Sequence, residues 1–334
     1  MRLVSFRGAH TRGLGVLSPD GELVCNLAAA AEERGDPRPG AFARAKNLLR
    51  AGPAGMERAR KLSQWAFDER PDGIVEALRD VELMSPVPQP ASIRDAMSFE
   101  RHVIGATRRG GLGRLGTLDA LIERRVGPRR SLAGRLNRAF YERPLYYKSN
   151  PHSVVGPDAE VRMPAYTKRF DYELEWGVFI GVGGADIPES EARDHIAGYT
   201  IFNDFSARDI QIAEMRGRLG PAKGKDFDTG NAIGPWLVTP DELREPYALT
   251  MTARVNGAEW SRGSTGEMHW RFEEIISYIS RSETLRPGDF IGSGTVGGGC
   301  GLELGAFLSA GDVVELEVER IGILRNRVVA ARPG

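Results

Sequence analysis

The sequence predicts an α+β fold that is mainly β, in which a mixed β-sandwich roll follows a small N-terminal α/β domain. From Lys148 onward, short apolar runs such as YELEWGVFIGV, AGYTIFNDF and VVELEVERIGIL are bounded by Gly, Pro, Asp and Asn, as strands and turns are. The proline-rich segment SPVPQPAS, residues 85–92, reads as a linker. A chain of 334 residues can hold two domains, and we predict them at residues 1–85 and 86–334.

The N-terminal segment begins with strand signals and continues with helices. RLVSF and GLGVLSPDGELVCNL predict strands, with Pro19-Asp20-Gly21 as a turn. AFARAKNLLRAG and ERARKLSQWAFDE carry apolar residues at helical spacing and predict two amphipathic helices. This order of elements is the basis for the predicted N-terminal domain.

The stretch after the linker is expected to be helical. SIRDAMSFERHVIGA predicts a helix with Ser92 as its N-cap. The basic stretch TLDALIERRVGPRRSLAGRLNRAFYERP continues the helical pattern. We therefore expect a helical segment over residues 104–140, which either covers the β domain as a solvated helix pair or moves as a lid over a site. Further on, one helix, MHWRFEEIISYISRSE, is expected among the strands.

Composition excludes several classes of partner. Lys and Arg total 45, as do Asp and Glu, so the formal net charge is zero and nothing favours binding to nucleic acid or an anionic membrane. Two cysteines allow no disulfide framework. The sequence contains no run of 18 apolar residues that would predict a membrane span, and we expect a cytoplasmic protein. The motif GLGRLG lacks the preceding apolar strand that a dinucleotide site requires.

Two glutamates in FDYELEWGVFIG, residues 170–181, are the first candidate site residues. As a strand, this stretch places Glu173 and Glu175 on one face, about 7 Å apart. The pair is either part of a solvated face or shares a divalent cation, because close carboxylates repel each other. Oxygen ligands of this kind suit Mg²⁺, Mn²⁺ or Ca²⁺.

Further acids and one histidine favour the cation. Asp204 follows the apolar strand AGYTIF directly, which suits a third ligand. Asp95 precedes His102 by seven residues, so on a helix both side chains would share one face. Asp95 would then reach the cation while His102 faces the molecule that the cation binds.

Together these residues resemble the fumarylacetoacetate hydrolase family, and in particular a bacterial member of it. The matching segments are Asp95-x6-His102, Glu173-Leu174-Glu175 and NDFSARDIQ at 203–211. GKDF at 224–227, Gly294-Thr295 and Leu302-Glu303 are similar to later family motifs, and the resemblance covers roughly residues 85–330. It implies a mixed β-sandwich roll that forms a homodimer.

The resemblance also implies the site and its chemistry. Asp95, Glu173, Glu175 and Asp204 would bind a divalent cation, Mg²⁺ before Mn²⁺ or Ca²⁺; His102, Glu303 and Lys225 would be catalytic; Arg208, Gln211 and Thr295 would bind substrate. The expected activity is hydrolysis of a C–C bond in a 1,3-diketone or acylpyruvate-like small molecule, with water activated by His102 and Glu303. Decarboxylation, isomerisation, hydration and lyase reactions on the same scaffold are the alternatives.

One departure from the family pattern favours the hydrolase. The smaller acylpyruvate-cleaving and decarboxylating relatives often carry a glutamate three residues after the histidine, where this chain has Gly105. It carries Glu303 instead, as the hydrolase proper does. Tyr146, Tyr147 and Lys148 lie where the family often lines its pocket, and the sequence assigns them no individual roles.

Overall fold

The computed structural model describes residues 1–8 and 12–331, so positions 332–334 of the predicted second domain lie outside it. Its strands are β1 Arg2–Arg7, β2 Arg12–Leu17, β3 Leu23–Asn26, β4 Val75–Ala77, β5 Glu82–Met84, β6 Ile93–Met97, β7 Leu145–Ser149, β8 Val154–Val155, β9 Glu160–Arg162, β10 Phe170–Asp171, β11 Glu175–Ile180, β12 Ile196–Asp204, β13 Ser206–Ala207, β14 Asn231–Val238, β15 Thr250–Val255, β16 Ala258–Ser264, β17 Phe290–Gly292, β18 Val313–Val318 and β19 Gly322–Val329. Its α-helices are α1 Leu27–Glu33, α2 Ala45–Arg50, α3 Gly52–Glu69, α4 Glu100–Thr107, α5 Leu115–Val126, α6 Leu132–Leu136, α7 Arg208–Arg216, α8 Phe272–Ser280 and α9 Gly301–Leu304.

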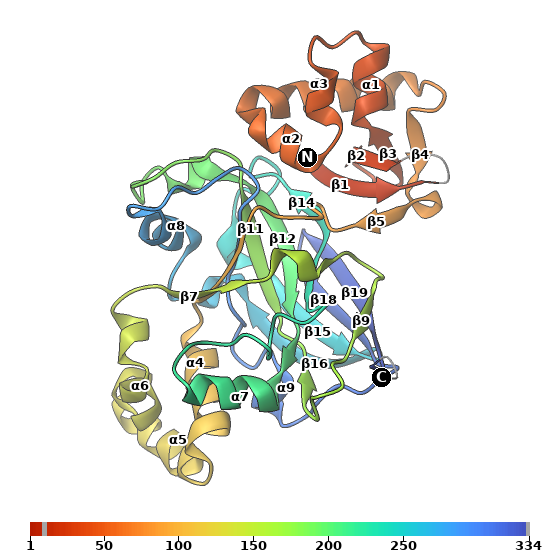
Figure 1. The fold of residues 1–334 in the computed structure, drawn as a ribbon. Coiled ribbons are helices and arrows are strands. Elements are labelled where there is room, and N and C mark those ends of the chain that lie inside the picture. Colours follow the sequence, from red (N-terminus) through yellow and green to blue (C-terminus); the bar gives the residue numbers. More distant parts are fainter. Residues whose placement is uncertain (9–11, 332–334) are drawn as a thin grey trace.

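Two mixed sheets organise the fold, as Figure 1 shows. Within the described residues, the larger sheet has twelve strands, with the main order β4-β3-β2-β1-β14-β12-β11-β17-β6-β7. The smaller sheet has the order β16-β15-β18-β19-β9, and β10 pairs with β13. This mixed-sheet architecture with helices at its margins confirms the predicted fold class.

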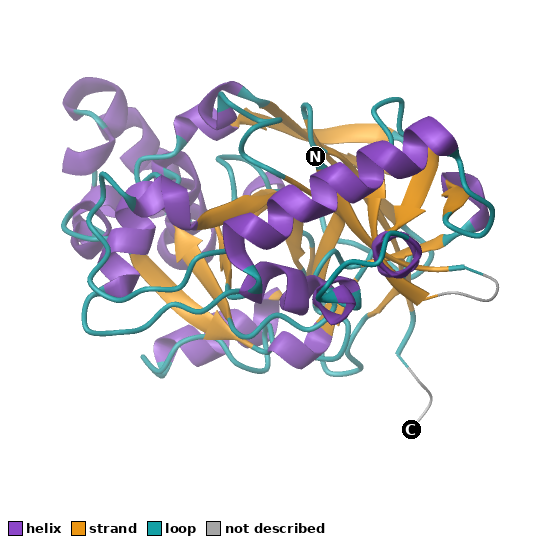
Figure 2. Ribbon diagram, turned by 90° about the horizontal axis from the view of Figure 1, so that it is seen from above, coloured by secondary structure: helices purple, strands orange, loops and turns teal. Residues whose placement is uncertain are grey.

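The N-terminal segment is joined to the rest of the chain through the larger sheet. β1 pairs antiparallel with β14, with Leu3 opposite Leu237. Helices α1, α2 and α3 lie over one side of this part of the sheet (Figure 2). The predicted turn is present, with Gly21 at a φ of 80°, while α1 was not predicted. The division at residue 85 stays a prediction.

The two faces of the larger sheet belong to different cores. Alternation along β11 and β12 sends Trp176 and Tyr199 into a core shared with the smaller sheet and α8. Phe179 and Phe202 point the other way, into a core shared with Leu48 and other residues of the N-terminal helices. The central strands are therefore covered on both sides, and a site can form only at their ends.

The helix predicted from Ser92 is wrong in its first half. Residues 93–97 form β6, which pairs in parallel with β17 and antiparallel with β7, so both of its edges are occupied by backbone hydrogen bonds. Ser92 does not cap a helix, and its hydroxyl donates to Asp289. The helix α4 begins only at Glu100. Asp95 and His102 therefore do not share a helix face, because Asp95 lies on a strand and His102 on α4.

Two other expectations also change. The stretch 170–181 is not one strand, because β10 ends at Asp171 and β11 begins at Glu175, with Glu173 in an isolated bridge to Cys300. After residue 148, α7 and α9 accompany the single predicted helix, which is α8. The predicted helical segment 104–140 is present as the end of α4, α5, α6 and a π-helical turn at Arg108–Leu112. None of the helices among the described residues is long and apolar enough to span a membrane.

Candidate functional site

A cavity of about 640 Å³ opens where β6, β7, α4 and α7 approach one another. Eight of the ten predicted site residues line it: Asp95, His102, Glu173, Glu175, Arg208, Gln211, Lys225 and Thr295. The other two are hydrogen-bonded to lining residues, Asp204 to Lys225 and Glu303 to His102. The structure thus brings all ten together at one place.

The predicted metal ligands are buried carboxylates. Asp95 is 5% exposed, Glu173 4%, and Glu175 and Asp204 are fully buried, so the interpretation as a solvated face is wrong. Burial and the neighbouring Asp204 raise the pKa of Asp95 well above its usual value, and burial and Asp95 do the same for Glu175. Burial also raises the pKa of Asp204, to about 6. These carboxylates repel one another unless a cation or protons neutralise them.

Lys225 and Arg208 supply part of that neutralisation. Lys225 Nζ lies 2.5 Å from both Glu173 Oε2 and Asp204 Oδ2, and Arg208 Nη2 lies 2.8 Å from Glu173 Oε1. Burial opposes the charged form of Glu173, but Arg208 and Lys225 outweigh it and lower its pKa. Arg208 also donates to buried Asp171, at 2.7 Å. Within the described residues, five buried carboxylates therefore face two cationic side chains, those of Arg208 and Lys225.

Two oxygens in this cluster have no hydrogen-bond partner. Glu175 Oε2 and Asp204 Oδ1 are buried and unpartnered within the described part of the chain. An unpaired buried carboxylate oxygen is costly. A divalent cation with oxygen ligands would satisfy both atoms and reduce the excess negative charge. The residues present therefore fit a hard divalent cation held by Asp95, Glu173, Glu175 and Asp204.

The residues predicted to bind substrate contact these carboxylates. Thr295 Oγ1 donates to Glu175 Oε1 at 3.1 Å. Arg208 is 2% exposed, and its Nη1 donates to Gln211 Oε1 at 2.8 Å, so its guanidinium is already committed to protein acceptors. The geometry makes Arg208 a partner of the site acids, and its predicted contact with substrate stays a prediction. Direct substrate contacts of Thr295 and Gln211 stay predictions.

Tyr147 belongs to the site, and sequence reasoning gave it no role. Its register partner across the sheet is Asp95, and its hydroxyl donates to Asp204 Oδ2. Lys148, the next residue along the strand, is exposed and lies 3.4 Å from Glu283 instead. Successive side chains of β7 point to opposite faces, which separates Tyr147 from Lys148. Because these residues were not assigned to a strand from the sequence, this signal was missing.

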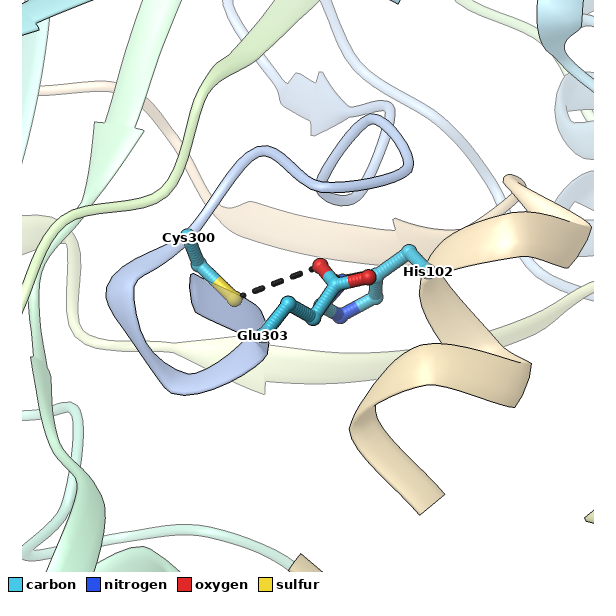
Figure 3. A group of neighbouring side chains, drawn as sticks. All are labelled: His102, Cys300 and Glu303. Carbon is cyan, nitrogen blue, oxygen red and sulfur yellow. Dashed lines mark hydrogen bonds and ion pairs between the residues drawn. The ribbon is translucent and has the colours of Figure 1, made fainter. Parts of the chain in front are cut away.

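His102 and Glu303 form a hydrogen-bonded pair at the edge of the cavity. His102 Nδ1 lies 2.7 Å from Glu303 Oε2, and the backbone N–H of Gly298 donates to Glu303 Oε1 at 3.1 Å. Figure 3 shows His102 reaching from α4 toward Glu303 and Cys300, which share one turn of the chain. Because Nδ1 is held by the carboxylate, Nε2 is the ring nitrogen left for proton transfer.

Gly105 makes room for this pair. A Cβ at that position would lie 2.3 Å from Glu303 Oε1, so the carboxylate occupies the space next to α4 that any larger side chain would need. This is the position where the relatives described above often carry a glutamate. The carboxylate beside the histidine therefore comes from α9 here, rather than from α4.

The cluster of His102, Cys300 and Glu303 also has the spacing of metal ligands, with candidate ligand atoms within 4.8 Å of one another. Its chemistry argues against that use. Burial raises the pKa of the Cys300 thiol well above its usual value, so the thiol stays protonated and donates to Glu303 Oε2 at 3.4 Å. We therefore infer that Cys300 and Glu303 orient the imidazole of His102. The candidate metal site is the group of four carboxylates instead.

Comparison with known proteins decides the family. The family model described as fumarylacetoacetate (FAA) hydrolase C-terminal matches residues 129–329, more than half of the chain. The chain belongs to the fumarylacetoacetate hydrolase family. A Burkholderia ambifaria relative is 32% identical over 286 residues, which cover 82% of this chain and 96% of that protein.

Other members of the fumarylacetoacetate hydrolase family that resemble this chain carry different activities in their names. Human mitochondrial oxaloacetate tautomerase FAHD2A is 38% identical over 187 residues, 56% of this chain and 59% of that protein, so the match spans less than two thirds of that relative. The crystal structure of a probable 2-hydroxyhepta-2,4-diene-1,7-dioate isomerase from Mycobacterium abscessus superposes with a TM-score of 0.71 at 26% identity, covering 100% of both chains. The family is thus established, but the names of these similar proteins do not agree on one reaction.

Proposed function

We propose that this protein is a divalent-cation-dependent hydrolase that cleaves a C–C bond in an acylpyruvate or related 1,3-diketone. The observation that carries the proposal is the His102–Glu303 pair, whose side chains lie 2.7 Å apart, with His102 lining the same cavity as three of the four buried carboxylates. A base oriented by a carboxylate suits the activation of water. Carboxylate oxygens suit a cation that binds adjacent substrate oxygens.

His102 has the central part in the proposed reaction. A water molecule gives a proton to His102 Nε2 while its oxygen adds to the substrate carbonyl, and Glu303 stabilises the imidazolium that results. The C–C bond then breaks, its electron pair stays on the departing carbon as an enolate, and the proton on His102 is available to that carbon. A bound divalent cation supplies polarisation of the carbonyl and neutralisation of the enolate.

The outer part of the cavity supports a substrate with an apolar acyl group. Beyond the charged residues, the wall is formed by Met97, Val103, Ala106, Leu145, Ile212, Met215 and Leu302. Burial of apolar substrate atoms against such side chains contributes about 0.8 kcal/mol for each CH₂ group. We therefore propose acylpyruvates with aliphatic or aromatic acyl groups as the preferred substrates. Asn137 and Arg216 also line this cavity.

Tautomerisation is the second candidate function, because two similar proteins are named as a tautomerase and an isomerase. The same His102–Glu303 pair would then move a proton between an enol oxygen and carbon without adding water. Turnover of a panel of acylpyruvates and of oxaloacetate in H₂¹⁸O separates the two. Hydrolysis places ¹⁸O in the product acid, whereas tautomerisation leaves the carbon skeleton intact. Release of two products without label in the acid would contradict hydrolysis.

Dependence on a cation is tested with the same substrates. Chelation should abolish turnover, and Mg²⁺ or Mn²⁺ should restore it, because the four carboxylates otherwise lack sufficient positive charge. His102→Ala should lose turnover even when Mg²⁺ is saturating. Full activity of the chelated protein would leave the carboxylates a structural role only. A homodimer stays part of the proposal and is measured by light scattering.

A further inference from the structure

A second cavity, of about 690 Å³, lies on the other side of β6 from the carboxylate site. Asp95 lines the first cavity and the adjacent Arg94 lines the second, because successive side chains of a strand point to opposite faces. Arg50 at the end of α2 and Arg286 in the loop before β17 complete a wall with three arginines from three separate segments. Nothing in the proposed reaction uses this cavity.

Arg94 is the buried part of this wall. It is 5% exposed; its Nη2 lies 2.5 Å from Glu283 Oε1, and its Nη1 lies 2.5 Å from Ser92 Oγ and 3.5 Å from Asp289 Oδ2. Its Nε, however, is buried without any hydrogen-bond partner in the described chain. A buried donor of a charged group that lacks an acceptor is costly. Arg94 Nε can therefore donate to one further acceptor, which the described residues do not supply.

The other cations around the cavity are not paired. Over residues 1–8 and 12–331, neither Arg50 nor Arg286 has a side-chain hydrogen bond or ion pair, and both are exposed. Lys46 packs its stem near Gly288 at the same place. Burial lowers the pKa of Lys46, and the charge of Arg50 acts in the same direction while Asp289 opposes both.

The acids at this place do not balance the cations. Asp289 already accepts from the Ser92 hydroxyl at 2.7 Å and from the backbone N–H of Arg286 at 2.9 Å. Glu283 is shared between Arg94 and Lys148. Within the described residues, both carboxylates are therefore paired with Arg94, and neither forms an ion pair with Arg50, Arg286 or Lys46.

We propose that this cavity binds a small multivalent oxyanion, a molecule that carries phosphate, sulfate or several carboxylate groups. Guanidinium groups match such oxygens in geometry and charge. Three of them, from separate segments of the chain, can contact one ligand from several sides, which a single surface arginine cannot do. The ligand would connect α2 of the N-terminal segment with the loop at 284–289 and with β6. The site is independent of the proposed hydrolysis and can exist whatever reaction the first cavity supports.

Thermal unfolding of the full chain, with Mg²⁺ present, tests this site without an activity assay. Sulfate, inorganic phosphate and succinate are titrated separately at constant ionic strength, with chloride as the baseline. Because a ligand that binds only the folded state stabilises it, at least one of these anions should raise Tm saturably, by about 2 °C or more. A shift by phosphate and sulfate alone identifies tetrahedral oxyanions as the ligand class, and a shift by succinate alone identifies carboxylates.

The double variant R50A/R286A should abolish the shift, and R50K/R286K should retain part of it because the charge remains. Both replaced side chains are exposed, so the fold should persist. Arg135→Ala, which removes an exposed arginine from α6, is the control and should leave the shift unchanged. Absence of a saturable shift with all three anions, or a full shift in R50A/R286A, would overturn the proposal.

Discussion

The substitution Gly105→Ala tests how Glu303 acts. The new Cβ would lie 2.3 Å from Glu303 Oε1 and 3.1 Å from its Cδ, so the flexible carboxylate must turn away from α4. Its 2.7 Å contact with His102 Nδ1 is then lost. A hydrogen bond to a charged group contributes about 1.5–3 kcal/mol, which corresponds to a loss of about 10- to 150-fold in kcat/KM.

The same substitution should leave the fold intact. Alanine favours a helix interior over glycine by about 1 kcal/mol, which offsets part of the cost of moving Glu303. Steady-state hydrolysis of the best acylpyruvate is therefore measured beside urea unfolding. Gly40→Ala, a change in a short helical turn with open space around it, is the control for both measurements. Activity of Gly105→Ala within about twofold of the unsubstituted protein would refute the placement of Glu303 as the orienting group.

Two further predictions concern buried groups. Lys225→Met should lower the free energy of unfolding by about 3–5 kcal/mol in urea titrations without added metal, because buried Glu173 and Asp204 both lose the ammonium group between them. The exposed Lys148→Met should cost less than about 1 kcal/mol, and equal costs would contradict this reasoning. Both cysteines should resist alkylation at pH 8 in the folded protein and react in denaturant, because burial raises the pKa of Cys25 to about 12 and that of Cys300 well above its usual value. Rapid labelling of either native thiol would show that it is accessible.

The residues selected by motif spacing lie together in the structure, although the local structure around two of them differs from the prediction. Asp95 and His102 were expected on one helix face, yet they meet the same cavity from a strand and from the helix that follows it. The predicted residues were selected from the order of residue types in a family, and the roles given to them stay predictions. The helix prediction failed because pairing of β6 with strands far away in the sequence overrides local propensity.

The sequence did not predict which residues far apart along the chain contact each other. Arg208 turns toward Asp171 and Glu173, and Tyr147 reaches Asp204 across 57 positions. These pairings depend on sheet register and on the depth of each side chain, which composition and periodicity do not specify. The strand pattern of FDYELEWGVFIG likewise gave the correct face for the two glutamates but not their burial, since burial depends on what the rest of the chain packs against that face.

The pairing of β1 with β14 has a consequence for any shortened form of the chain. Removal of residues 1–85 would uncover the edge of β14 and, beneath the lost helices, the apolar side chains of Phe179, Phe202 and Leu237. An open strand edge beside an apolar surface is a template for intermolecular pairing. The N-terminal segment thus covers both the strand edge and the apolar surface, and a fragment that begins at residue 86 is expected to associate with another molecule there.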